Sequence, residues 1–502
     1  FGSSRRRPYR DLAPGPLALA GMRWRACCAR RRALRVCPAS PVRQPRASRG
    51  GCCSGRRERT FVDLWGEAEA VEPGGGLDPR WLSQFPLSVR GRHVVSAHGE
   101  RFRLRGVNWY GASDEYHAVG GLDVQSLDVI CETVRALGFT VVRLPFSNEM
   151  LRSHPRAGSI DFGRNPQLAG LSSLEVLDEV VRCLGRHSVA VILNNHTTYG
   201  LWCGGPNRNG LWFHPGNKQY TEDSWIEDWC MLATRYRQCR HVVGYDLRNE
   251  VRFSPWPFRW PSWRPGALAR CLGGCSWSRA AAACSERLLA RSPDALLFVE
   301  RIVWPQRGLQ EYADSTGPLM AKFRDNLVLA VHHYSWSGPG RYLVFAHTMN
   351  KGLAWLMKRT LRALCVFTPE NYGDMSQSRL SEQIFREWGY LLEAGTCPVW
   401  VSEFGTGPED GYDLEWFQGF LHIMAALDAD FAYWPLNVGP KPGSGGDESY
   451  GMLSPEWTPK PEGDRRLDML RMHGLLTPPK TGDVRSGTRQ LDGATLKSRS
   501  KK

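Results

Sequence analysis

The chain has 502 residues, of which 42% are hydrophobic and 23% are charged. It is therefore long and apolar enough to bury a large core, and its charge content excludes a wholly disordered protein. The formal net charge of +15 belongs to the ends, because residues 1–60 hold 16 Arg and two acids and residues 480–502 hold seven basic residues and two acids. Residues 61–479 carry a formal charge of −4, which argues against a nucleic-acid-binding body.

The two basic ends are predicted to lie outside the folded domain. Residues 1–79 form an Arg-rich segment that we expect to be disordered or processed, and residues 479–502 form a basic tail. This leaves 80–478 as the folded domain. Binding of the Arg-rich end to RNA or a membrane surface is the alternative, but we expect no nucleic-acid partner. Every run of eighteen residues contains a charge or a polar interruption, so no transmembrane helix is expected.

Apolar, β-rich segments alternate with helical patterns along the domain. A hairpin is predicted around His98-Gly99, where two short β-rich runs meet. Eight segments downstream have the composition of buried strands: 102–109, 140–145, 189–195, 242–248, 295–300, 327–333, 398–403 and 430–436. Apolar residues recur at helical spacing in 122–137, 172–187, 222–238, 279–291, 379–394, 412–427 and roughly 464–474.

Eight such units predict an α/β fold, a (β/α)8 TIM barrel with an N-terminal β-hairpin and an extended loop after the sixth strand. A doubly wound open sheet is the alternative. That fold would need a phosphate-binding glycine fingerprint after the first strand, and the sequence VNWYGAS at that position is not one.

Polar residues follow the predicted strands at the end where parallel barrels carry their chemistry. They are Arg143, Asn195-His196, Asn249-Glu250, His332 to Tyr334, Glu403 and Trp434. Two carboxylates at the same end of the barrel indicate acid/base catalysis of a reaction that uses two carboxyl groups. Glycoside hydrolysis uses one acid to protonate the leaving oxygen and a second carboxylate on the opposite side of the anomeric carbon.

The motifs RGVNWYG, VVRLPFSNEM, VILNNHTT, DLRNE, HHY, VSEFG and YWPLN resemble those of glycoside hydrolase family 5, the cellulase family, in order and spacing over residues 85–460. The chain is similar in particular to plant and algal members, which share GGLD and NPQL and a Gly-Leu-Trp here at 210–212. The resemblance implies that Glu250 is the acid/base and Glu403 the nucleophile. It implies substrate-binding roles for Arg143, His196, Asn249, His332, Tyr334 and Trp434, and it requires no metal or cofactor.

Other residues are weaker candidates for the site. The 20 tryptophans offer flat apolar faces that suit sugar rings, and Trp109, Trp202, Trp212 and Trp304 lie in or near the loops at the carboxyl ends of the strands. Hydroxyl contacts are assigned to Asp114, Glu115 and His117. Asn148-Glu149 repeats the Asn-Glu dipeptide, but it follows the Arg143 strand in a loop and is expected to contact the rim. The pair Cys271 and Cys275 has no matching second pair, so it supports a zinc site only weakly.

The sequence thus predicts a retaining glycoside hydrolase of endo-β-1,4-glucanase type, acting on a β-linked oligo- or polysaccharide. A β-mannanase or a β-glucosyl-lipid hydrolase with the same mechanism, and a non-catalytic carbohydrate-binding barrel, are the alternatives. Residues 341–367 read as a basic, apolar helix that packs on the barrel or contacts lipid. A secreted or endomembrane-lumen location is favoured, although a chain that starts with Phe does not allow a signal peptide to be judged.

Overall fold

The computed structural model describes residues 69–477, with gaps at 154–156, 204–207, 256–257, 264, 303–316, 339–370, 409–410 and 442–445. The Arg-rich segment up to residue 68, the tail from residue 478, Trp304 and the segment 341–367 lie outside the described residues. The proposed domain boundaries stay predictions. Val71, upstream of residue 80, is buried, and its backbone N–H donates to the carbonyl of Arg235 at 2.7 Å.

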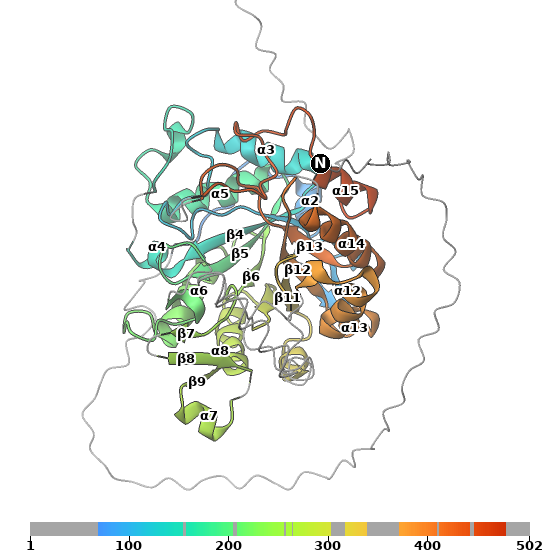
Figure 1. Ribbon diagram of the computed structural model, residues 1–502. Coiled ribbons are helices and arrows are strands. Elements are labelled where there is room, and N and C mark those ends of the chain that lie inside the picture. The colour runs from blue at the N-terminus through green and yellow to red at the C-terminus, as the bar shows by residue number, and fades with distance from the viewer. Residues whose placement is uncertain are drawn as a thin grey trace, which may run out of the picture. The chain divides into compact units, whose positions relative to one another are not determined.

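Eight parallel strands close into a barrel, and each one overlaps a predicted strand (Figure 1). Around the barrel the order is β10-β11-β12-β13-β3-β4-β5-β6. The bounds are β3 (Arg105–Asn108), β4 (Val141–Ser147), β5 (Ala190–Thr197), β6 (Val242–Asp246), β10 (Leu296–Glu300), β11 (Leu327–His333), β12 (Val399–Phe404) and β13 (Asp430–Tyr433). The predicted (β/α)8 fold is confirmed, and the open-sheet alternative is excluded by closure.

Helices follow the strands at the predicted positions. The longer ones are α3 (Leu127–Leu137), α5 (Ser173–Arg186), α6 (Glu222–Arg235), α8 (Trp277–Leu289), α12 (Gln377–Ile384), α14 (Tyr412–Leu427) and α15 (Arg465–Met472); α2 (Pro79–Leu82), α4 (Asn148–Ser153), α7 (Ala267–Cys271) and α13 (Tyr390–Glu393) are short. Local sequence sets their ends. α3 starts after the Ser126 cap and stops at Gly138, whose φ of +101° suits glycine, while Ser172 and Glu175 form a capping box on α5. No described helix has both the length and the apolarity to span a bilayer.

The predicted N-terminal hairpin is present, but its turn lies earlier than expected. β1 (Ser88–Arg90) pairs with β2 (His93–Val95), and the turn between them contains Gly91. The chain also turns at His98-Gly99, as predicted, but there it forms only an isolated antiparallel bridge between Val95 and Arg101. The apolar residues of the hairpin pack with the side chains inside the barrel. The hairpin therefore covers the inner core, away from the carboxyl ends of the strands.

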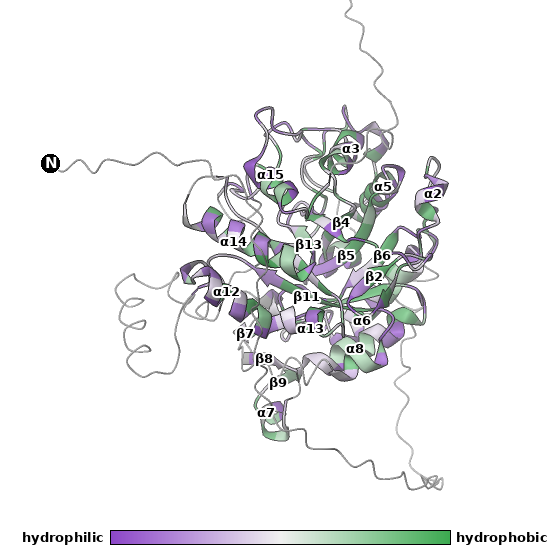
Figure 2. Cartoon of the chain, turned by 90° about the vertical axis from the view of Figure 1, so that its right-hand side faces the viewer, coloured by the Kyte–Doolittle hydropathy of each residue, from purple (hydrophilic) through white to green (hydrophobic). Residues whose placement is uncertain are grey.

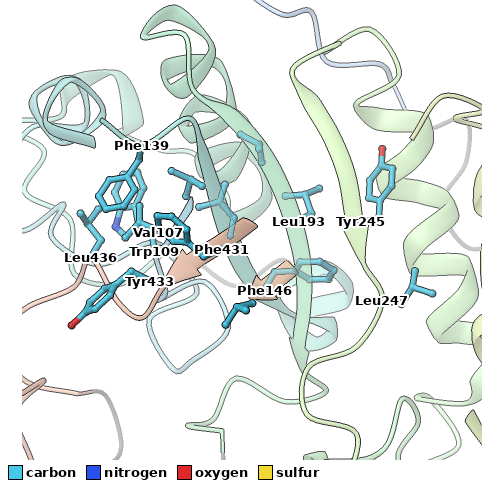
Figure 3. Packing of buried hydrophobic residues seen from close by; sticks show 14 of the residues in the cluster. Val107, Trp109, Phe139, Phe146, Leu193, Tyr245, Leu247, Phe431, Tyr433 and Leu436 are labelled. Carbon is cyan, nitrogen blue, oxygen red and sulfur yellow. The ribbon is translucent and has the colours of Figure 1, made fainter. Parts of the chain in front are cut away.

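The strands are buried on both faces, which is why they read as continuous apolar runs. The inner core fills the barrel and includes Val141, Ile192, Phe298, Ala330 and Trp400. The outer core joins strands to helices, and Figure 3 shows part of it, with Val107, Trp109, Phe146, Leu193, Tyr245 and Phe431. In Figure 2 the helices around the barrel carry both hydrophobic and hydrophilic residues, as helices that pack on a core by one face do.

Two features depart from the simple pattern. An insertion after β6, not predicted from sequence, forms a small sheet of β7 (Ser254–Pro255), β8 (Phe258–Ser262) and β9 (Gly274–Ser276) together with α7. The helix predicted over 379–394 is divided by a π-helical turn at Phe385–Gly389. That turn brings Glu387 and Trp388 into the core, where Glu387 pairs with Arg301 at 2.7 Å.

Candidate active site

The inner face of the barrel changes from apolar to polar toward the carboxyl ends of the strands. Because side chains alternate along a strand, the residue two positions after an inward residue also faces inward. Arg143, Glu300 and His332 stand two positions after Val141, Phe298 and Ala330 of the inner core. The polar layer therefore sits directly on the apolar one.

Arg143 is the centre of this layer and is fully buried. Its Nε donates to Asp246 at 2.8 Å, its Nη1 donates to Asn108 at 2.9 Å and Glu403 at 2.6 Å, and its Nη2 donates to Asn249 at 2.9 Å and Glu300 at 2.8 Å. The guanidinium thus uses its planar set of donors to hold five side chains from four other barrel strands or their ends.

Glu250 and Glu403 face each other across a short gap. A carboxylate oxygen of each residue and a ring nitrogen of His332 all lie within 4.8 Å of one another. Nδ1 of His332 is 3.4 Å from Oε1 of Glu250 and 3.4 Å from Oε2 of Glu403. The hydroxyl of Tyr334 donates to Oε2 of Glu403 at 3.1 Å. The two acids, 153 positions apart in the chain, therefore form one site.

The charges in this layer fix the state of its ionisable groups. Burial lowers the pKa of His332, but the carboxylates of Glu300 and Glu403 outweigh burial and raise that pKa to about 10. Burial raises the pKa of Glu403, with His332 and Arg143 acting in the opposite direction. Burial and the negative charge of Glu300 raise the pKa of Asp246 to about 8. The surrounding carboxylates therefore favour the protonated form of His332, whose Nδ1 then donates to Oε1 of Glu250 at 3.4 Å.

A cavity of about 320 Å³ opens above the two acids. Of the residues predicted for the site, it is lined by Asp114, His196, Trp202, Asn249, Glu250, Tyr334, Glu403 and Trp434. The Trp434 ring stacks on His196 at a centroid distance of 5.6 Å and on Tyr110 at 5.3 Å, with interplanar angles of 6° and 15°. Flat aromatic walls beside carboxylates suit a sugar ring, whose faces are apolar and whose rim is polar.

Several predicted contacts are corrected by the structure. Trp109 and Trp212 are fully buried in the outer core, and their ring N–H groups donate to the carbonyl of Gly120 and the carboxylate of Glu222. They cannot stack on a sugar, because neither face of the ring reaches the cavity. Arg143 and His332 lie beneath the cavity and contact the carboxylates instead of lining it. Glu115 and His117 are absent from the cavity wall.

The second Asn-Glu dipeptide has a different place. Glu149 lies on α4, and its carboxylate accepts the backbone N–H of Gly200 at 2.8 Å. It braces the loop that follows β5, as predicted for a rim contact. His333 points away from His332 into the shell of helices, where its Nε2 accepts from Trp388 at 2.8 Å.

Side chains of types that could ligate a metal ion gather at two places in the described residues. One is Glu250, His332 and Glu403, and the other is Asp128, Cys183 and His187, where Nε2 of His187 contacts Oδ1 of Asp128 at 2.9 Å and ties α5 to α3. All nine described cysteines are free thiols, and Cys271 and Cys275 belong to neither cluster.

Sequence reasoning missed Asn108, Asp246 and Glu300 as parts of the site. All three end or nearly end a barrel strand, and Glu300 stands in the run LLFVE. Because side chains alternate along a strand, an inward-facing Phe298 implies that Glu300, two positions later, also faces inward, so this residue was predictable. The loop residues Tyr110, Cys203, Trp336, Lys441, Glu448 and Tyr450 also line the cavity. Loop sequences carry no such period, so their position was not predictable.

Comparison with known proteins identifies the family. The cellulase profile, described as glycosyl hydrolase family 5, matches residues 95–439. An endoglucanase of Paenibacillus polymyxa is 28% identical over 383 residues, which cover 74% of this chain and 83% of that protein. A glycosyl hydrolase 5 family protein of Chamaecyparis obtusa is 25% identical, covering 74% of this chain and 63% of the relative.

Among solved structures, the catalytic domain of the major endoglucanase of Xanthomonas campestris pv. campestris superposes with a TM-score of 0.59 at 25% identity. The superposition covers 77% of this chain and 99% of that domain. With a family match that spans well over half of its residues, this chain belongs to the cellulase family, glycosyl hydrolase family 5, and is a glycosidase.

Proposed function

We propose that this glycosidase is an endo-β-1,4-glucanase that works with retention, with Glu403 as nucleophile and Glu250 as acid/base. The observation that carries the proposal is the short gap between the two acids, whose nearest oxygens lie within 4.8 Å of each other. Retaining enzymes hold their carboxyl groups about 5–5.5 Å apart, whereas inverting enzymes need about 6.5–9.5 Å to admit a water molecule.

The reaction has two displacements. In the first, an oxygen of Glu403 bonds to the anomeric carbon while the bond to the leaving oxygen breaks and Glu250 gives that oxygen its proton. In the second, water attacks the anomeric carbon, Glu250 takes a proton from it, and the bond to Glu403 breaks. The released sugar keeps its β configuration.

Neighbouring groups suit these roles. Arg143 and Tyr334 donate to Glu403 at 2.6 and 3.1 Å, which stabilises its ionised form and prepares it for attack. Asn249 lines the cavity, and its carbonyl oxygen accepts from Arg143. Its amide nitrogen donates one hydrogen to the Cys203 sulfur at 3.3 Å, and we assign its second N–H to a sugar hydroxyl.

The substrate assignment rests on the aromatic walls of the cavity and on the names of the relatives, which are endoglucanases. We further propose that the chain is nearest in type to plant and algal members, because it carries GGLD and NPQL and is similar to a Chamaecyparis obtusa protein. Lipid contact through 341–367 and a secreted or lumenal location stay predictions.

The test replaces the two proposed catalytic acids and, as a control, the Glu of the second Asn-Glu dipeptide, Asn148-Glu149. Glu250→Gln and Glu403→Gln should each lower kcat on carboxymethylcellulose and aryl β-cellobioside at least a thousandfold, since each removes a group that acts on the reacting atoms. Glu149→Gln is the matched control: Glu149 is absent from the cavity wall and holds only the backbone of the loop at Gly200, so kcat should fall less than tenfold. The first product, followed by NMR, should be the β anomer.

The same assay separates the alternatives. Turnover of mannan or glucosylceramide above that of glucan would replace the substrate assignment and keep the mechanism. Binding of cello-oligosaccharide without any turnover by the wild type would favour a carbohydrate-binding barrel. An α-anomeric first product would reject retention.

A further inference from the structure

Glu250 has an unusual backbone conformation. Its φ is +42°, in the left-handed region that residues with a side chain adopt only when their surroundings hold them there. Two hydrogen bonds hold the chain here: the N–H of Asn249 donates to the carbonyl of Asn195 at 2.9 Å, and the N–H of Glu250 donates to Oε2 of Glu300 at 2.7 Å. The carboxylate of Glu300 is thus a direct support of the strained residue.

The other carboxylate oxygen of Glu300 contacts Arg143, the cation that also binds Glu403. Oε1 accepts from Nη2 of Arg143 at 2.8 Å, and Nη1 of the same guanidinium donates to Glu403 at 2.6 Å. One carboxylate therefore links the backbone of Glu250 to the guanidinium that orients Glu403. Glu300 is 2% exposed and is absent from the cavity wall, so it does not touch a substrate.

Glu300 also faces His332. Nε2 of His332 is 3.5 Å from Oε2 of Glu300, while its Nδ1 is 3.4 Å from an oxygen of Glu250 and of Glu403. The remaining charged or titratable groups near the ring are Arg143, Asp246 and His196, besides its chain neighbour His333. The negative charge of Glu300, close to the ring, favours its protonated form and raises the pKa of His332.

We propose that Glu300 is a positioning residue, which fixes the backbone of Glu250 and aligns Arg143 and His332 between the two catalytic carboxylates. The inference rests on the proposed roles of Glu250 and Glu403. It assigns Glu300 no contact with the substrate, so its loss acts on the chemical step and leaves substrate binding almost intact.

Two substitutions of Glu300 separate the effect of its negative charge from the effect of its side-chain length. Glu300→Gln removes the charge, and its single carbonyl oxygen cannot accept from both Arg143 and the N–H of Glu250. Glu300→Asp keeps the charge but is one methylene shorter. We expect Glu300→Gln to lower kcat on aryl β-cellobioside about a hundredfold, as misplacement of a catalytic group by about 1 Å does, with KM changed less than threefold. Glu300→Asp should recover part of that loss.

Glu387→Gln is the matched control, because Glu387 is an equally buried carboxylate paired with an arginine, but it lies in the helical shell. It should lower the thermal midpoint without changing kcat at temperatures where the protein is folded. A loss of kcat in this control equal to that in Glu300→Gln would overturn the positioning role, since any buried carboxylate would then have the same effect.

The second readout is the protonation of His332, followed by NMR of ¹³C-labelled histidine and assigned with His332→Gln. In the wild type the ring should stay protonated at pH 8. In Glu300→Gln its titration should move down by about 1–3 pH units, the shift expected when an adjacent opposite charge is removed. A merely structural carboxylate would leave this titration unchanged.

Wild-type kcat together with an unmoved His332 titration in Glu300→Gln overturns the inference. If Glu300→Gln does not fold, Glu300→Asp decides: a lowered kcat with the ring still protonated supports the role, and a wild-type kcat rejects it. If Glu250→Gln and Glu403→Gln keep their activity, the proposed function itself fails. If those two are inactive while Glu300→Gln is normal, only the positioning role fails.

Discussion

Arg143 holds Glu403 through a hydrogen bond of 2.6 Å from Nη1 to Oε1, beneath the floor of the cavity. The same guanidinium is also ion-paired to Asp246 and Glu300, so one buried cation serves three buried carboxyl groups. Such a network is stable only while every member keeps its partner, because a buried charge without one has lost its hydration.

Arg143→Lys should therefore be severe despite the conserved charge. An ammonium has three donors and no planar fork, so it cannot reproduce five hydrogen bonds. We expect the free energy of unfolding to fall by about 3–5 kcal/mol and kcat to fall at least a hundredfold. Urea denaturation and steady-state kinetics measure both. Arg301→Lys, at the Glu387 pair in the helical shell, is the comparison; equal kinetic losses in the two variants would contradict the role of Arg143.

We expect Asp114 to make the stability of the protein depend on pH. Burial raises the pKa of this cavity-lining carboxyl to about 7, and its Oδ2 has no hydrogen-bond partner among the described residues. A raised carboxyl pKa means that its stabilising contribution is complete below about pH 3.8 and is lost as the pH rises through 7.

Asp114→Asn removes that titration. The variant should match the wild type near pH 4 and should become more stable than it at pH 8, by at most about 4 kcal/mol. Urea denaturation at pH 4, 5.5, 7 and 8 measures the difference. Glu115→Gln, at the exposed neighbouring carboxylate, is the control for removing one negative charge from this loop. A constant difference between Asp114→Asn and wild type at every pH would refute the buried-carboxyl explanation.

Trp434 is expected to bind sugar through its ring. It lines the cavity in a stack with His196 and Tyr110. At about 25 cal/mol per Å² of apolar surface, one sugar face contributes on the order of 1–2 kcal/mol, so Trp434→Ala should raise KM for cellotetraose about tenfold. Trp434→Phe keeps an aromatic face, so its KM should lie between those of the wild type and Trp434→Ala. Calorimetric binding in the Glu403→Gln background checks affinity directly; unchanged affinity in Trp434→Ala would exclude stacking.

Trp109 gives the opposite prediction. Its side chain is fully buried, and its ring N–H donates to the carbonyl of Gly120 at 2.9 Å. Trp109→Ala should lower the free energy of unfolding by about 3–5 kcal/mol by leaving a cavity in the outer core. KM for cellotetraose, measured well below the melting temperature, should stay within twofold of wild type. A raised KM at unchanged stability would return Trp109 to the list of sugar contacts.

The sequence by itself determined the architecture and the chemistry. Buried strands leave continuous apolar runs, helices leave a period of 3.6, and their regular alternation permits few topologies, so all eight barrel strands were predictable. The polar residues that interrupt those runs at the strand ends included Arg143, Glu250 and Glu403. Their convergence follows from the parallel order of the strands alone.

Only the tertiary structure decided which tryptophans face the cavity and which lie in the core. Trp109 and Trp434 both stand beside a strand end, yet Trp109 is buried in the outer core and Trp434 lines the cavity, because the direction of a loop side chain depends on distant neighbours. The support of Glu250 by Glu300 likewise needs a carboxylate and a backbone N–H that are 50 positions apart. A contact between strands leaves no pattern in a single sequence, since it arises only when the barrel closes.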